Sequence, residues 1–231
     1  MLLSMLSRVN HLPLLVLLAV SSMGILTACN SKKNQDALAG EEAGKMMTTS
    51  SYNYTGHNLY DISFKDAAVP FDVAGAARAG SVFLRNSDSA LLDDGGKYHF
   101  SFSDCCFMWD KRLPAPTKLR VVWSVVFDLD LFEGESGRAY DDRASRSPAP
   151  GSRWCTAVVE VIGPVPTTAD NFSLHFLNDG TVVGNYGRAQ APMPLSITQL
   201  NKHAEAMPKR QYCRQETTNP WFGIPRTPHR E

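Results

Sequence analysis

The sequence predicts an all-β protein: an antiparallel β-sandwich of the immunoglobulin-like kind, with one short helix near the C-terminus. Three observations lead to this prediction. Apolar and polar residues alternate with period two in many short stretches, clusters of Gly, Asp and Pro separate those stretches, and only residues 195–207 show helical spacing between flanking prolines. Short strands with turn signals at such intervals are typical of β-sandwiches.

The N-terminal residues 1–28 have the features of a signal peptide. Arg8 is followed by a run, residues 12–26, that contains no ionisable side chain. The run is shorter than the roughly twenty residues that a transmembrane helix needs, and Pro13 and Gly24 interrupt it. An exported chain is therefore expected.

The signal ends in Leu26-Thr27-Ala28-Cys29, which resembles the lipobox of bacterial lipoproteins. The resemblance implies cleavage before Cys29 and lipid on its thiol, which would anchor the chain to a membrane stably because several acyl chains act together. Asn30, where inner-membrane lipoproteins carry Asp, implies an outer-membrane lipoprotein that faces the periplasm. The alternative is an ordinary secretory signal in which Cys29 is incidental.

The rest of the chain divides into a tether and one domain. Residues 29–51 are small and polar with little to bury, and they are expected to be a flexible tether after the lipidated cysteine. Residues 52–231 are expected to form a single β-sandwich domain. The sequence has 23 Lys and Arg residues and 23 Asp and Glu residues, so it has no net positive charge that would attract nucleic acid. We therefore do not expect nucleic-acid binding.

The first expected strands are short and the later ones are clearer. Residues 52–55, 59–64 and 81–84 are candidate strands between turn clusters. Residues 98–103 alternate aromatic with polar side chains, which predicts a half-buried strand. Residues 119–131 repeat this alternation at greater length, with apolar residues on one face and Arg or Asp on the other.

The C-terminal half continues the pattern. The charged, Ser- and Pro-rich residues 138–153 predict a long exposed loop, and the β-branched residues 154–162 predict a central strand that is covered on both faces. Residues 172–177 and 181–183 flank Asn178-Asp179-Gly180, and an Asp-Gly pair between such runs predicts a β-hairpin.

Four cysteines follow the anchor: Cys105, Cys106, Cys155 and Cys213. An even number in an exported chain predicts two disulfides. If the vicinal pair lies on an extended strand, its two thiols point to opposite faces, so we expect one to join Cys155 and the other Cys213. A zinc site is the alternative, but adjacent cysteines lack the two-residue gap that lets both thiolates reach one metal. No metal is expected.

The sequence contains no arrangement of residues typical of an enzyme. No Ser stands in a glycine elbow, and the spacing of His57, His99, His175 and His203 supports no catalytic pair. His99 and His175 fall on the outward positions of their strands. The acidic residues 128–135 do not match a calcium-binding loop. We therefore expect neither catalysis nor a cofactor.

Four residues are candidates for binding a protein partner: Trp109, Arg112, Arg138 and Arg143. Trp and Arg are favoured anchors in protein interfaces, and the three arginines lie near or within charged loops. The alternative for Trp109 is that it closes the end of the sandwich.

Part of the chain, residues 52–128, resembles a proteobacterial lipoprotein family that is known as domain of unknown function 3304. The resemblance is carried by Tyr52-Asn53-Tyr54-Thr55-Gly56, Gly95-Gly96-Lys97-Tyr98, Cys105-Cys106 with Trp109, and Leu119-Arg120-Val121-Val122-Trp123. The chain departs from the family in lacking its long glycine run and in having Phe-Met-Trp after the cysteines.

The resemblance implies a function. Members are similar to the immunity lipoproteins of type VI secretion lipases, which implies a periplasmic protein that binds and neutralises a secreted phospholipase effector. The alternative is a structural or ligand-binding cell-envelope lipoprotein, which a deep apolar pocket between the sheets would favour.

Overall fold

The computed structural model describes residues 44–85, 88–92, 95–102, 107–109, 116–134, 143–161, 164–189 and 193–225. Five of the predicted site residues lie outside these ranges: Cys29, Cys105, Cys106, Arg112 and Arg138. The predicted signal peptide and most of the predicted tether also lie outside them. No helix in the described part of the chain is long and apolar enough to span a membrane.

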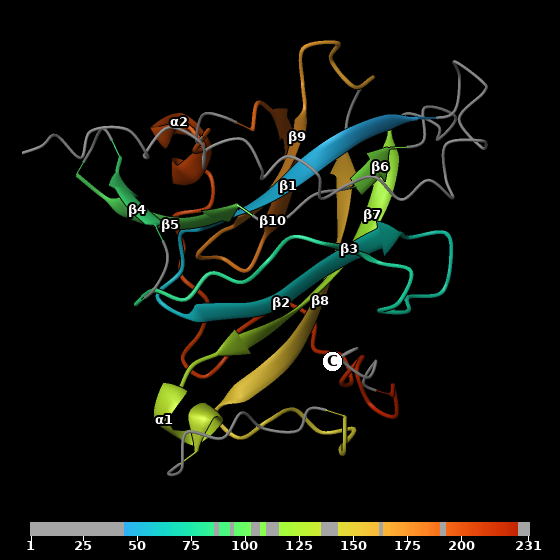
Figure 1. The fold of residues 1–231 in the computed structure, drawn as a ribbon. Coiled ribbons are helices and arrows are strands. Elements are labelled where there is room, and N and C mark those ends of the chain that lie inside the picture. The colour runs from blue at the N-terminus through green and yellow to red at the C-terminus, as the bar shows by residue number, and fades with distance from the viewer. Residues whose placement is uncertain are drawn as a thin grey trace, which may run out of the picture. The chain divides into compact units, whose positions relative to one another are not determined.

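The described residues form two β-sheets (Figure 1). The first has the order β10-β9-β1-β5-β4, with β6 also paired to β1. Its strands are β1 (Lys45–Asn53), β4 (Asp88–Leu91), β5 (Lys97–Phe102), β6 (Phe107–Trp109), β9 (Asn171–Phe176) and β10 (Val182–Gly187). The second has the order β3-β2-β7-β8, with β2 (Asn58–Asp66), β3 (Ala77–Arg78), β7 (Thr117–Val126) and β8 (Ser152–Val161).

The predicted β-sandwich is confirmed. Most strand pairs are antiparallel, but β1 and β9 run parallel, so the first sheet is mixed. A hydrophobic core joins the inner faces of the two sheets. Aromatic pairs cross it: Phe64 of β2 lies 5.3 Å from Phe172 of β9, and Trp123 of β7 lies 5.2 Å from Phe176 of β9, measured between ring centroids.

The domain begins earlier than expected. Residues 45–51, assigned to the tether from their composition, are the first seven residues of β1, and β1 lies in the interior of its sheet. The hydroxyls of Thr49 and Ser51 are buried and donate to the carbonyls of Arg78 and Ala79 at 2.6 and 2.7 Å. Because hydrogen bonds satisfy these buried hydroxyls, a polar segment can form a central strand.

The predicted strand at residues 119–131 ends early. Its inner face is as expected, since Leu119, Val121, Trp123 and Val125 lie in the core, but β7 stops at Val126 and helix α1 (Leu129–Glu133) follows. The side chain of Asp128 accepts a hydrogen bond from the Leu131 backbone N–H at 3.0 Å and caps this helix. Asp is a favoured N-cap, which explains why the alternation does not continue as a strand.

β8 is also placed differently from the prediction. It lies at the edge of its sheet, beside β7, and not at the centre. Val158 is 55% exposed on it. The C-terminal segment replaces a neighbouring strand in part, because the Thr156 N–H donates to the Gln215 carbonyl and the Thr217 N–H donates to the Trp154 carbonyl, both at 2.9 Å.

The predicted hairpin of β9 and β10 and the single late helix are present, with changed bounds. Gly180 in the hairpin turn has φ +76°, a conformation that glycine adopts without strain. The helix α2 (Ile197–Asn201) is shorter than the predicted residues 195–207, and Ser196 and Gln199 form a capping box at its start. The candidate strand at residues 81–84 is reduced to a bridge between Leu59 and Val82.

Candidate functional site

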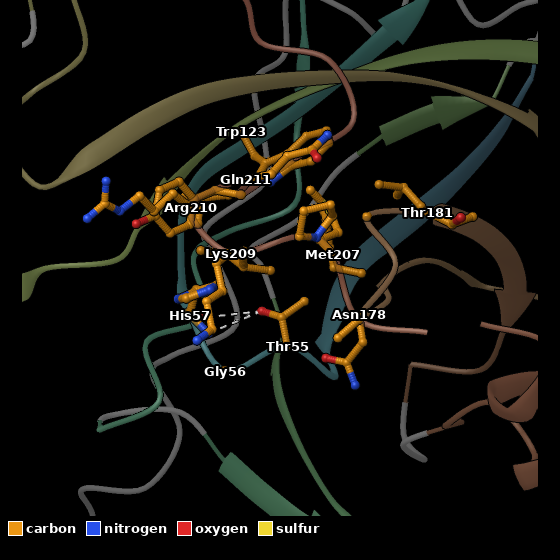
Figure 2. A pocket seen from close by; sticks show the side chains of 18 residues that line it. Thr55, Gly56, His57, Trp123, Asn178, Thr181, Met207, Lys209, Arg210 and Gln211 are labelled. Carbon is orange, nitrogen blue, oxygen red and sulfur yellow. Dashed lines mark hydrogen bonds between the residues drawn. The ribbon is translucent and has the colours of Figure 1, made fainter. Parts of the chain in front are cut away.

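A pocket of about 360 Å³ opens at one end of the sandwich (Figure 2). Three chain segments surround it: residues 55–57 between β1 and β2, residues 178–182 of the β9–β10 turn, and residues 206–212, which we call the strap. The volume is within the range of about 300–1,000 Å³ that is typical of small-molecule sites.

The floor of the pocket is apolar. It consists of side chains from the inner faces of both sheets, all of them buried: Leu59, Trp123, Val125, Phe176 and Val182. The pocket therefore reaches the hydrophobic core at the end of the sandwich, where the two sheets meet.

The rim of the pocket is polar and basic. Its side chains are those of Thr55, His57, Asn178, Thr181, Lys209, Arg210 and Gln211. Among the described residues that line the pocket, none carries a carboxylate, so Lys209 and Arg210 give the rim a positive charge. Burial lowers the pKa of the His57 imidazole below its ordinary value, so this ring is neutral at pH 7.

The β1–β2 connection is held by Asn53. Its side-chain carbonyl accepts from the backbone N–H of Thr55 at 2.9 Å and from the Thr55 hydroxyl at 2.7 Å. Its amide group donates to the His57 carbonyl at 2.7 Å. Such Asx interactions fix a turn locally, so His57 is presented at the rim in a defined position, with its ring edge against Tyr212.

The strap is fixed where it leaves the pocket. Tyr212 stacks on Phe127 with ring centroids 4.1 Å apart, and the next residue, Cys213, forms a disulfide with Cys155 of β8. Arg210 has φ 69°, a left-handed conformation that costs a non-glycine residue roughly 1–3 kcal/mol. The contacts of its neighbours hold this strained residue at the rim.

The disulfide corrects the expected pairing. We predicted that Cys155 and Cys213 would each join one member of the pair Cys105 and Cys106, but they join each other, with their Cα atoms 5.9 Å apart. The reason is that the C-terminal segment lies along β8, where Glu216 forms a β-bridge with Cys155. The sequence gives no signal for this pairing because Cys213 belongs to no predicted strand.

Asp179 joins the hairpin turn to the segments on both sides of the strap. Its carboxylate accepts hydrogen bonds from His203 Nδ1 at 2.9 Å, from the Arg214 guanidinium at 2.6 Å and from the Thr181 hydroxyl at 2.9 Å. Burial alone would raise the pKa of Asp179, but these hydrogen bonds and the charge of Arg214 outweigh burial and hold its pKa below the ordinary value. The carboxylate is therefore ionised and structural.

Of the predicted partner-binding residues, Trp109 and Arg143 belong to the described part of the chain, and neither lines this pocket. Trp109 is only 4% exposed and lies in the core against Phe107 and Tyr186, so the alternative that it closes the sandwich is the better interpretation. Arg143 packs its guanidinium over the ring of Trp221, 5.0 Å from the centroid, on the outer face of the second sheet. Trp109 is therefore not an exposed anchor, whereas the partner-binding role of the half-buried Arg143 stays a prediction.

His175 was predicted to point outward into solvent, and it is fully buried. Its ring stacks on Tyr52 with centroids 4.6 Å apart, and its Nδ1 lies 3.2 Å from the Tyr54 hydroxyl. The prediction was wrong because the backbone N–H groups of Met193 and Leu195 donate to the hydroxyls of Tyr52 and Tyr54, so the loop before α2 covers this face. Burial lowers the pKa of His175 to about 3.

Comparison with known proteins does not identify the function of this site. No family model, curated protein or solved structure matches the chain. Within the described residues, no group of three His, Cys, Asp or Glu side chains is placed to hold a metal ion. Sequence reasoning missed the pocket, and its one local signal was the basic pair Lys209 and Arg210 directly after Pro208, where the helical pattern stops.

Proposed function

We propose that this protein is a lipid-anchored lipoprotein of the bacterial outer membrane that faces the periplasm and acts by binding. Its partner is a secreted phospholipase effector of a type VI secretion system, which it neutralises as an immunity protein. The anchor rests on the lipobox at Cys29, and the class of partner rests on the family resemblance of residues 52–128. The pocket end of the sandwich is the proposed binding surface.

The position of the pocket supports this assignment. The tether joins the domain at Lys45, the first residue of β1, whereas the pocket rim begins at Thr55, just beyond the other end of that strand. A nine-residue strand spans roughly 26 Å at about 3.3 Å per residue. The pocket end is therefore the end of the strand that is remote from the attachment point, where a soluble partner could reach it.

The observation that carries the proposal is the fixed strap. The disulfide, the Tyr212–Phe127 stack and the ion pair between Arg214 and Asp179 hold residues 206–212 in one arrangement. A surface that is rigid before binding loses less conformational entropy when a partner docks. The exposed side chains of Lys209, Arg210 and Gln211 are thus presented in a form ready for a partner.

The test is protection of cells from a periplasm-directed phospholipase encoded beside this gene. Co-expression of the full chain should restore growth, and the two proteins should co-purify at one-to-one stoichiometry. Replacing both Lys209 and Arg210 by Glu should reduce protection and co-purification, whereas Lys202→Glu, at an exposed position outside the pocket, should leave both unchanged. A full chain that neither binds nor protects would exclude the immunity function.

A second candidate is a ligand-binding envelope lipoprotein. The observation in its favour is the pocket itself, because an apolar floor below a small number of polar groups is the usual construction of a small-molecule site. The two candidate functions differ in what they require: an immunity protein requires a toxin partner, and a ligand-binding lipoprotein does not.

A further inference from the structure

We infer that the pocket binds a small amphiphile with a carboxylate head and an apolar chain, the class of compound to which free fatty acids belong. This inference names a ligand for the second candidate function and rests on the pocket being a binding site. It is independent of any protein partner.

The floor of the pocket suits an apolar chain. Leu59, Trp123, Val125, Phe176 and Val182 are buried core side chains that also line the cavity. A chain placed there would remove apolar surface from water on both partners, at about 25 cal/mol for each Å². A polypeptide segment is a poorer occupant, because its backbone amides would need hydrogen-bonding partners, and among these five side chains only the Trp123 indole N–H can supply one.

The rim suits a carboxylate. The described lining residues include two cationic side chains, Lys209 and Arg210, and no anionic one. In Figure 2 the Arg210 side chain extends away from the other lining side chains, whereas Lys209 lies near His57. We therefore assign Lys209 as the residue that binds the carboxylate of the ligand. The amide groups of Gln211 and Asn178 are further donors at the rim.

The ends of the strap explain how such a pocket stays open. The Met207 N–H donates to the Asn178 carbonyl at 3.2 Å, and within the strap the Gln211 N–H donates to the Pro208 carbonyl at 3.0 Å and closes a turn. Cys213 is bonded to Cys155 just beyond. Because both ends of the strap are held, the strap cannot collapse onto the apolar floor without breaking these contacts.

The inference is tested with the mature chain, residues 29–231, carrying Cys29→Ala so that no detergent is needed. The probe is a dansyl-labelled undecanoic acid whose emission rises and shifts to the blue in an apolar site, and the competitors are decanoate and decanol. We expect decanoate to displace the probe in a saturable way. Vesicles of phosphatidylglycerol, which carry negative charge without offering a free acid, should not displace it.

Two variants locate the site. Lys209→Gln should weaken decanoate binding about two- to fivefold, the effect of one exposed ion pair, and leave decanol binding unchanged. The matched control Lys202→Gln should change neither. Val182→Phe fills the cavity from its floor and should abolish binding of both competitors, with thermal unfolding measured to show that the variant is folded.

Three results would overturn the inference: no saturable probe binding, displacement by vesicles but not by decanoate, or a Lys209→Gln chain whose affinity for decanoate is unchanged. The same variants are assayed for protection from the phospholipase. A chain that binds no decanoate yet protects cells would refute the ligand and leave the immunity function standing, and the converse result would refute immunity alone.

Discussion

His175 shows at the residue scale how a covered sheet face changes the chemistry of one side chain. Alternation along its strand placed it on the face away from the core, and this is correct, since Phe172, Leu174 and Phe176 fill the core positions. The loop that donates to Tyr52 and Tyr54 then excludes water from that face. A charged imidazolium is disfavoured there, so His175 is neutral in the folded protein.

This burial predicts a pH dependence of stability. The pKa of His175 is lowered from 6.5 to about 3, so the unfolded chain binds one more proton than the folded chain between these values. The contribution of the neutral His175 ring to stability is therefore fully present above about pH 6.5 and is lost as the pH falls toward 3. His175→Phe should flatten this slope in urea unfolding at pH 7, 6 and 5. His99→Gln, at a partly exposed position, should retain most of the slope, and a steep slope in His175→Phe would contradict the assignment.

A second prediction at this scale concerns the buried hydroxyl of Ser51. Ser51→Ala leaves the Ala79 carbonyl without this donor, and a buried polar group that loses its partner costs about 1–3 kcal/mol. The free energy of unfolding in urea should fall by this amount. Ser145→Ala is the control, since its hydroxyl accepts from the Ser147 backbone N–H in an exposed contact and should matter less. Equal losses for both variants would show that burial does not set the cost.

The strand elements show what alternation can and cannot predict. The inner faces of β7 and β9 and the hairpin at Asp179 follow directly from apolar periodicity and turn chemistry. β1 could not be found in the same way, because Thr49, Ser50 and Ser51 are polar yet buried. Their burial depends on acceptors that are distant in sequence, such as Asn171 for Ser50, and no local pattern reveals such acceptors.

The pocket could not be predicted for a related reason. Its floor consists of residues that periodicity assigns correctly to the core, Trp123 and Val125 among them. Its rim comes from three turns that meet only in the folded chain. The sequence thus predicts which residues are apolar or basic, whereas the strap's position depends on a disulfide that spacing did not predict.

Asp179 connects the β9–β10 turn to the chain segments on both sides of the strap, through His203 and Arg214. Asp179→Asn removes the negative charge that pairs with Arg214 and the acceptor used by His203. We expect the melting temperature to fall at pH 7. Because the pKa of Asp179 is lowered in the folded state, its contribution is present above about pH 4 and is lost as the pH falls through the folded pKa.

The wild-type protein and Asp179→Asn should therefore become more alike in stability below about pH 4, measured by thermal unfolding across the pH range. Asp130→Asn is the matched control, since this carboxylate lies exposed in the first turn of α1. A constant difference between wild type and Asp179→Asn at every pH would show that the charge of Asp179 is unimportant.

At the scale of the whole molecule, the Cys155–Cys213 disulfide joins the C-terminal segment to the second sheet and thereby places the strap over the pocket. The two cysteines are separated by 58 residues, and closing a loop of this size contributes roughly 2–5 kcal/mol, chiefly by restricting the unfolded chain. Cys213→Ser should therefore lower the free energy of unfolding by an amount in this range. It should also weaken probe binding at the pocket, because the strap would lose its fixed end. Peptide mapping under non-reducing conditions should recover Cys155 linked to Cys213, and recovery of Cys155 linked to Cys105 or Cys106 would exclude this arrangement of the strap.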